Sequence, residues 1–146
     1  MLEYPDCKLH LVGDGDLRLE IEQLVAQLQL NEAVIFHGMQ SDVHPYLQSA
    51  DVFVLSSSYE GMPMTIIEAM GTGLPIVASA VGGIPDMIRD GQSSLLVQPE
   101  PEEIANAILM MLRDASLREK LGRTAREDSV RFSAEYMARE YCKVYL

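Results

Sequence analysis

Short apolar runs alternate with amphipathic stretches over the first 97 residues of the chain. Three of these runs, at 8–12, 33–37 and 51–55, have the length of a β-strand. The third, DVFVL, is a continuous apolar run after its aspartate, which is typical of a parallel strand covered on both faces. Strands that alternate with helices form parallel sheets. The sequence therefore predicts an α/β fold, a Rossmann-like parallel sheet with helices on both faces.

The segment after the first run is predicted to be an amphipathic helix packed on the sheet, because its apolar residues recur at helical spacing. Three further helices, at 101–112, 117–128 and 134–144, follow the last predicted strand at 94–97. A length of 146 residues suits one domain, so we expect a single domain over residues 1–146. The apolar positions of the first helix are Leu17, Ile21, Leu24, Val25 and Leu28.

Acidic residues outnumber basic residues, with 22 Asp and Glu against 11 Lys and Arg, and the net charge is −11. This charge repels polyanions, so we expect no nucleic-acid polymer as a partner. Local donors can still hold a single diphosphate. Hydrophobic residues make up 48% of the chain, which excludes a disordered chain.

The two cysteines, Cys7 and Cys142, lie near opposite ends of the chain and are expected to be free thiols. No CxxC motif or Cys/His cluster predicts a metal site. The first residues, MLEYPDCKLHLVG, lack the basic and apolar regions of a signal peptide. No apolar run approaches the roughly 20 residues that cross a bilayer. We therefore expect a soluble, cytoplasmic domain.

The segment 56–79 reads as a strand end, a tight loop, a short helix, a turn and a strand. Pro63 suits a first helical position because its φ is preset and its missing donor would be unpaired there. The helix is predicted to run from Pro63 to Met70. Its apolar side carries Ile66, Ile67 and Met70, and its other side carries Met64, Thr65 and Glu68.

The start of this predicted helix has the properties of an anion site. Free N–H groups at Met64 and Thr65, together with the helix dipole, favour a phosphate just outside that end. Glu68, one turn further along, is placed to accept hydrogen bonds from hydroxyls attached to the phosphate. Glu60, before the helix, could do the same on the far side.

The stretch EGMPMTIIEAMGTGLPIVAS resembles the E-x7-E segment of the retaining GT-B glycosyltransferases of family 4 (group 1), which use nucleotide sugars. The flanking stretches LHLVGDGDLRLEIEQL, VIFHGMQSD, ADVFVLSS and VGGIPDMIRDGQSSLLVQP agree in order and spacing. In that family the segment belongs to the C-terminal, donor-binding domain. The resemblance covers nearly the whole chain.

The resemblance implies transfer of a hexosyl group from a nucleoside-diphosphate sugar to an acceptor, without a metal, another cofactor or a protein nucleophile. Glu68 would accept hydrogen bonds from the ribose hydroxyls, and the amides of Met64 and Thr65 would hold the distal phosphate. Glu60 is the candidate catalytic residue. It would orient the sugar's hydroxyls together with backbone groups of Gly61, Met62 and Pro63.

Two loops are implied to lie near the nucleotide. The turn Gly13-Asp14-Gly15 follows a strand, but the third glycine of a dinucleotide fingerprint would stand where the chain has Arg18. In the family the loop after the next strand contacts the base, here through Met39 and Gln40. For the glycines, the alternative is a plain turn.

A third loop, Gly82-Gly83, can approach a ligand because it lacks side-chain bulk, and the resemblance places it beside the donor. The alternative is an ordinary turn before a short helix at 84–90.

The family's domain normally begins with a strand and loop whose Arg and Lys hold the diphosphate, and nothing before Cys7 matches them. In a doubly wound sheet that strand is central. We therefore expect a slot between the strands LHLV and DVFVL, closed by their direct pairing or filled by a second copy of the chain. The N-terminal acceptor domain of the family is expected as the missing partner, so the chain alone is expected to be inactive.

Two other functions stay open. A nucleotide-sugar epimerase shares the two-domain fold, but His10, His37 and His44 are not grouped in the sequence for proton transfer. A non-catalytic binding module would keep the fold alone. The donor sugar, the base and the acceptor are not predicted.

Overall fold

The computed structural model describes residues 4–145. The described residues form two compact units, one up to Val43 (unit 1) and one from His44 onward (unit 2). The prediction of a single domain stays a prediction.

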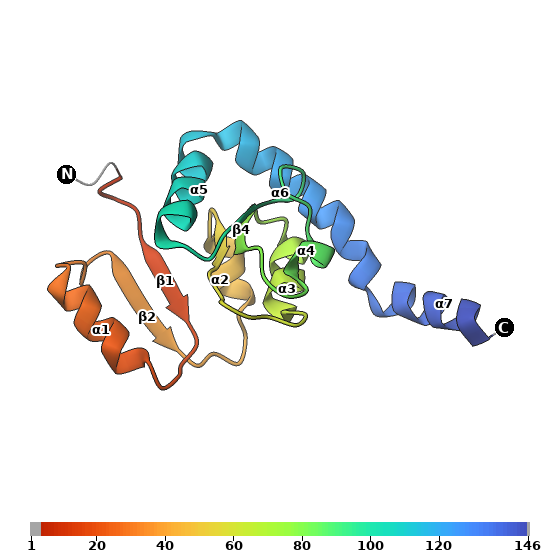
Figure 1. Ribbon diagram of the computed structural model, residues 1–146, viewed down its shortest axis with the longest axis horizontal. Helices are drawn as coiled ribbons and strands as arrows, with labels where there is room; N and C mark the ends of the chain where they lie inside the picture. The colour runs from red at the N-terminus through yellow and green to blue at the C-terminus, as the bar shows by residue number, and fades with distance from the viewer. Residues whose placement is uncertain (1–3, 146) are drawn as a thin grey trace. The chain divides into compact units, whose positions relative to one another are not determined.

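Unit 1 is a two-stranded parallel sheet with one helix, drawn in red and orange in Figure 1. Strands β1 (Leu9–Val12) and β2 (Val34–Gly38) are joined through helix α1 (Arg18–Gln27). Their register places Leu9 opposite Val34 and Leu11 opposite Phe36. The predicted apolar face of α1 contributes one buried residue, Val25, whereas the other four predicted positions are between 40% and 61% exposed.

Unit 2 contains a three-stranded parallel sheet in the order β3-β4-β5. Strand β4 lies in the middle, and all four of its residues are buried. The elements up to the last strand are α2 (His44–Ser49), β3 (Phe53–Leu55), α3 (Met64–Thr72), β4 (Ile76–Ser79), α4 (Ile84–Met87) and β5 (Ser94–Val97).

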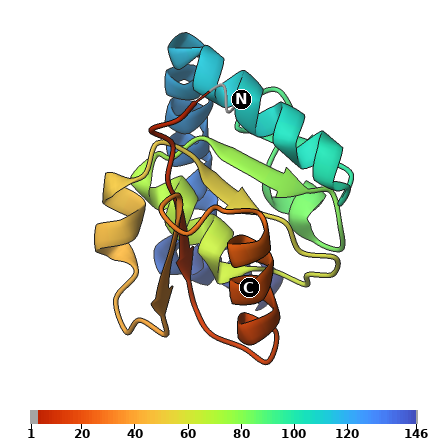
Figure 2. The same ribbon diagram turned by 90° about the vertical axis from the view of Figure 1, so that its left-hand side faces the viewer.

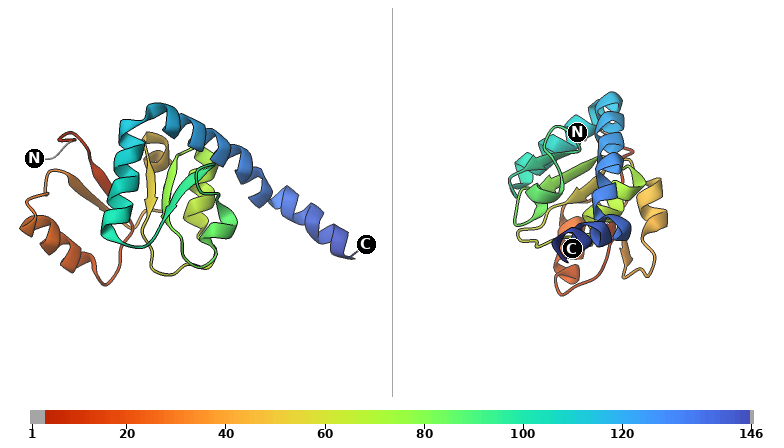
Figure 3. Two further views of the ribbon diagram at one scale, coloured as in Figure 1. Left: turned by 45° about the horizontal axis from the view of Figure 1, so that its top comes forward. Right: turned by 90° about the vertical axis from the view of Figure 1, so that its right-hand side faces the viewer.

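Helices cover the two faces of this sheet. Helix α5 (Pro101–Arg113) packs on β4 and β5, as Figure 2 shows. Helix α3 packs on β4, and the left view of Figure 3 shows the strands between α5 and α3. The core below α5 is built from Val77, Ala107, Met111 and Leu121, with Val54 and Leu95 among the partly buried residues around it.

The C-terminal segment continues through α6 (Ala115–Ser129), the 3-10 helix η1 (Val130–Phe132) and α7 (Ala134–Tyr145). Asp114 caps α6 by accepting a 2.9 Å hydrogen bond from the Leu117 amide. Helix α6 packs closely against α3, because a Cβ at Gly122 would lie 2.2 Å from the carbonyl oxygen of Gly73. Helix α7 packs against η1.

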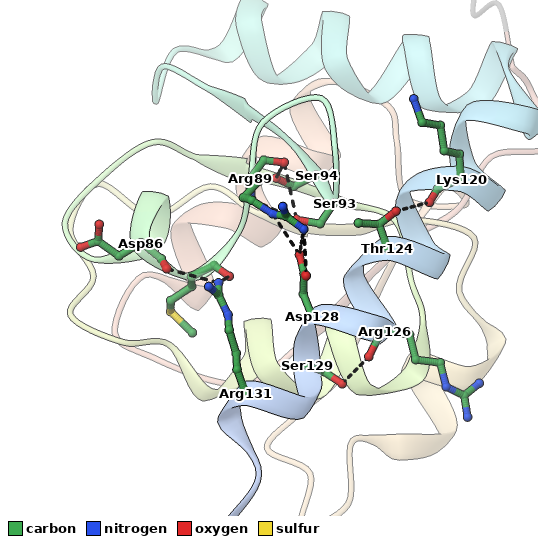
Figure 4. A network of polar contacts seen from close by, with 11 residues as sticks. Asp86, Arg89, Ser93, Ser94, Lys120, Thr124, Arg126, Asp128, Ser129 and Arg131 are labelled. Atoms are coloured by element: carbon green, nitrogen blue, oxygen red, sulfur yellow. Dashed lines mark hydrogen bonds and ion pairs between the residues drawn. The ribbon is translucent and has the colours of Figure 1, made fainter. Parts of the chain in front are cut away.

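A polar network fixes α4 to the C-terminal segment (Figure 4). The Arg89 guanidinium, which follows α4, forms an ion pair with Asp128 of α6 at 2.8 Å. Arg131 of η1 donates to the Asp86 carbonyl at 3.3 Å and also to the Met87 carbonyl. Arg131 therefore satisfies carbonyl groups at the end of α4, which have no partner inside so short a helix.

The α/β class, the parallel strands and the C-terminal helices are confirmed. Three details differ from the predictions. The strands form two separate sheets in which β1 pairs with β2 and β3 pairs with β4, so direct pairing of β1 with β3 is wrong for the described residues. β3 is only partly buried because it is an edge strand of its sheet, and α4 ends at Met87 rather than at residue 90.

Among residues 4–145, no helix combines the length and the apolar character that crossing a membrane requires.

Candidate functional site

The N-terminus of α3 is the centre of the site predicted in unit 2. Pro63 is the N-cap, with φ −68° and ψ 118°, and the helix begins at Met64. The predicted start at Pro63 is therefore wrong by one residue, because a ψ of 118° is extended rather than helical. The helix continues to Thr72, two residues past the predicted end, and Gly73 ends it in the left-handed conformation at φ 78°.

No side chain caps the start of α3. The amide of Ile66 donates to the Pro63 carbonyl at 3.2 Å, which is a contact of the first turn. Met64 and Thr65 are exposed, and Pro63 is buried. The amides of this first turn and the positive end of the helix dipole can bind an anion.

Glu68 lies one turn along the same face. It follows Met64 by four residues and Thr65 by three, which is the spacing of neighbours on a helix surface. Its side chain is partly buried, whereas Ile66, on the opposite face, is fully buried. The predicted division of α3 into a buried apolar face and a more exposed face that carries Met64, Thr65 and Glu68 is therefore present in the fold.

Glu60 lies in the loop between β3 and α3. The Ser57 hydroxyl donates a 2.7 Å hydrogen bond to Glu60 Oε1 and so fixes the orientation of the carboxylate. Glu60 is partly buried, whereas Gly61 and Met62 are exposed. This loop and the first turns of α3 carry all seven residues predicted for phosphate, ribose and sugar.

The Gly82-Gly83 loop contacts this segment through the main chain. The Gly83 amide donates to the Glu60 carbonyl at 3.1 Å. The sequence predicts that the lack of side chains at these glycines leaves room for a ligand. In the fold this room is occupied by the backbone of Glu60 and Gly61. No local sequence pattern predicts this contact.

In unit 1 the four residues predicted near the nucleotide follow the carboxyl ends of β1 and β2. The Gly13 amide donates to the Gly38 carbonyl at 2.8 Å, which joins the turn Gly13–Gly15 to the last residue of β2, just before the loop of Met39 and Gln40. In that loop Met39 is exposed, and Gln40 Nε2 donates to the His37 carbonyl at 2.7 Å.

Arg18 stands where a dinucleotide fingerprint would have its third glycine. Its guanidinium donates to Glu22 at 2.8 Å and to Asp14 at 3.1 Å. The hydrogen bond to Glu22, followed by that to Asp14, raises the pKa of Arg18 above its usual value. Arg18 Cζ also lies 5.8 Å from the centre of the Phe36 ring, so the side chain is held over this turn.

Sequence reasoning missed a histidine pair in unit 1. His10 Nδ1 and His37 Nε2 are 2.8 Å apart, and the rings are stacked with centroids 5.0 Å apart. The interpretation that the histidines are not grouped is therefore wrong for these two. The two residues are 27 positions apart, and the parallel pairing of β1 with β2 brings them together.

Within the described residues, no group of three or more His, Cys, Asp and Glu side chains is arranged to hold a metal ion.

Comparison with known proteins places this geometry in a family. The family model described as glycosyl transferases group 1 matches residues 1–128. The chain is 34% identical over 142 residues to N-acetyl-alpha-D-glucosaminyl L-malate synthase of Bacillus anthracis, covering 96% of this chain and 37% of that protein.

Two groups of solved structures share the fold. Anabaena Alr3699/HepE in complex with UDP is similar with a TM-score of 0.91 and 27% identity, over 97% of this chain and 41% of that chain. HepE in complex with UDP-glucose is similar with a TM-score of 0.88. The C-terminal domain of LpcC, a group 1 family glycosyl transferase of Francisella tularensis, is similar with a TM-score of 0.81 and 27% identity, over 90% of this chain and 73% of that chain.

The chain thus spans about two fifths of the length of the relatives that are whole proteins. The match to a C-terminal domain agrees with the resemblance drawn from the E-x7-E segment. Because the family model covers most of the sequence, the chain belongs to the group 1 glycosyl transferases.

Proposed function

We propose that this chain is the donor-binding part of a retaining glycosyltransferase, and that it binds a nucleoside-diphosphate hexose at the start of α3. The observation that carries the proposal is the uncapped N-terminus of α3, with Glu68 one turn along the same face and Glu60 just before the helix. The complexes of HepE with UDP and with UDP-glucose support a ligand of this class.

Each part of the donor has its own contacts in the proposal. The amides of Met64 and Thr65 hold the distal phosphate, and the helix dipole adds to their attraction. Glu68 accepts hydrogen bonds from the ribose hydroxyls. Glu60 and the backbone from Gly61 to Pro63 orient the hydroxyls of the sugar. The contacts to the nucleotide base that the resemblance implies, through Gly13, Gly15, Met39 and Gln40, belong to unit 1 and stay a separate prediction.

The proposed reaction separates the sugar from the diphosphate while donors fixed in advance stabilise the charge that develops on the leaving phosphate. The proposal includes no metal ion, no other cofactor and no covalent intermediate on the protein. Transfer also needs an acceptor held beside the donor, and we propose that a separate N-terminal acceptor domain provides it. The chain by itself is therefore expected to bind the donor without transferring the sugar.

Calorimetric titration of the purified chain tests the proposal. UDP, GDP and ADP are titrated alone and as their sugar conjugates. Saturable binding of one of these nucleotides is expected and would identify the base. No binding of any of them at millimolar concentration would contradict the donor site.

We also propose that the edge strands β1 and β3 pair with a second copy of the chain. Parallel edge strands present unpaired main-chain donors and acceptors, which favour pairing with another strand. Sedimentation equilibrium should then give a dimer mass, and a purely monomeric chain at micromolar concentration would contradict this pairing.

A further inference from the structure

The backbones of two loops in unit 2 touch where neither loop has a side chain in the way. A Cβ at Gly82 would lie 1.8 Å from the carbonyl oxygen of Glu60, and a Cβ at Gly83 would lie 2.1 Å from the carbonyl oxygen of Gly61. The Gly83 amide donates to the Glu60 carbonyl at 3.1 Å. Only glycine fits at either position while this contact is kept.

The Gly82-Gly83 loop is itself held in place. Gly83 is the N-cap of α4, and the last carbonyl groups of α4 accept hydrogen bonds from Arg131. Arg89, just beyond α4, is paired with Asp128. The contact therefore connects Glu60 to the body of unit 2 through main-chain atoms rather than through a flexible side chain.

Glu60 is also fixed from its own loop, because the Ser57 hydroxyl donates to its carboxylate at 2.7 Å. The glycine pair holds the main chain of Glu60, and Ser57 holds its side chain. Together the two contacts determine where the carboxylate points.

We propose that Gly82 and Gly83 are positioning residues for Glu60, and that their contact sets the carboxylate at the place where it recognises the hydroxyls of the donor sugar. This inference rests on the proposed donor site and adds the residues that hold Glu60 there. Neither glycine touches the sugar. They act through the backbone of the Glu60 loop.

The proposal predicts that a methyl group at either glycine weakens recognition of the sugar but not of the nucleotide. In Gly83→Ala the Glu60 loop must move, because atoms 2.1 Å apart cannot remain so. The amides of Met64 and Thr65 and the Glu68 carboxylate belong to α3 and keep their places. The ratio of the Kd of UDP-glucose to the Kd of UDP should therefore rise roughly tenfold, while the Kd of UDP changes by less than about twofold.

Three glycines provide matched controls. Gly91→Ala tests backbone strain alone, because Gly91 has φ +67° with nothing within 4 Å of an added Cβ, whereas Gly82 has φ +53° and a clash. Gly122→Ala tests a clash elsewhere, because its Cβ would meet the Gly73 carbonyl oxygen at 2.2 Å. Gly71→Ala has neither strain nor a clash. All three should keep the wild-type ratio, even where the variant is less stable.

A combined variant separates positioning from a general effect on the loop. Glu60→Gln should raise the same ratio, and adding Gly83→Ala to it should raise the ratio no further, because both changes remove one interaction. Independent, multiplicative effects would contradict the proposal.

A measurement on the wild-type chain avoids any question of whether the variants fold. Binding of UDP-glucose should slow hydrogen exchange at the Gly83 amide more than binding of UDP does, because a bound sugar holds Glu60 in contact with that amide. Equal protection by the two ligands would overturn the inference, as would a Gly83→Ala chain that keeps the wild-type ratio. If the wild-type chain binds neither UDP nor any other nucleotide of the titration, the proposed donor site itself fails, and this result is distinct from the other two.

Discussion

The Arg89 guanidinium donates hydrogen bonds to both carboxylate oxygens of Asp128, 39 residues away along the chain. Its Nη2 lies 2.8 Å from Oδ1 and 2.8 Å from Oδ2, and its Nε lies 3.2 Å from Oδ2. The Asp128 side chain is 20% exposed and that of Arg89 is 50% exposed, so this pair is less open to water than the pair Arg123–Glu119. It joins the segment after α4 to α6.

Breaking this pair should lower the free energy of unfolding by about 1 kcal/mol. Urea unfolding of Arg89→Ala, Asp128→Ala and the double variant gives the coupling between the two side chains. The pair Arg123–Glu119 is the matched control, because it spans four residues of one helix at 3.4 Å and its side chains are 65% and 78% exposed. Its coupling should be close to zero, and equal coupling in the two pairs would contradict the prediction.

Gly122→Ala should lower the free energy of unfolding by about 1 to 3 kcal/mol, because the added methyl group forces α6 away from the end of α3. Gly71→Ala is the control. Alanine is favoured over glycine inside a helix, and nothing lies within 4 Å of the added Cβ, so this variant should be unchanged or more stable. Thermal unfolding of both variants measures the difference, and equal melting temperatures would show that α6 is free to shift.

Asp114→Ala should cost about 1 kcal/mol of stability, because the cap at the start of α6 is lost. Asp114→Asn keeps an acceptor for the Leu117 amide and should recover most of the loss. Chemical unfolding monitored by circular dichroism compares the two. Nucleotide binding should be the same in both, because α6 takes no part in the proposed site.

Glu68→Ala should weaken nucleotide binding by roughly 1 to 3 kcal/mol if the Glu68 carboxylate binds the ribose hydroxyls. The matched control is Glu103→Ala, an exposed glutamate in the first turn of α5. Calorimetry with the nucleotide and with its 2′-deoxy form adds a second comparison. The wild-type chain should prefer the ribonucleotide, and Glu68→Ala should not. An unchanged affinity in Glu68→Ala would remove Glu68 from the site.

The local elements of the fold could be predicted from the sequence because their signals are local. Apolar runs located the strands to within about two residues, and the alternation of strand and helix indicated parallel pairing. The errors occur where a residue's own preference does not decide its conformation. Pro63 suits both an N-cap and a first helical position, and only its ψ distinguishes them.

The sequence predicts which residues form the candidate site, but it does not predict the contacts that hold them in place. The spacing of Glu60, Thr65 and Glu68 is read directly from the sequence, and α3 places Thr65 and Glu68 on one face, whereas Glu60 lies in the loop before the helix. The bond from Gly83 to Glu60 and the pairing of His10 with His37 join residues that are 23 and 27 positions apart. Such long-range contacts depend on which strands pair and in which register. A sequence pattern within one segment does not predict either.

The histidine pair also bears on the alternative that the chain is part of a nucleotide-sugar epimerase. The spacing of the histidines in the sequence was the argument against an epimerase, and the pair in unit 1 removes that argument. The match to group 1 glycosyl transferases over residues 1–128 favours the proposed glycosyltransferase over the epimerase.

The hydrogen bonds from Arg131 have a practical consequence for anyone who shortens this protein. The family model matches the chain only as far as residue 128, yet Arg131, three residues later, holds the end of α4 and lies over the ring of Phe132 at 4.8 Å. An expression boundary placed at the end of the family match would remove that side chain and its hydrogen bonds to the end of α4. A boundary placed after Phe132 keeps both the Arg131 hydrogen bonds and the ring that Arg131 lies over.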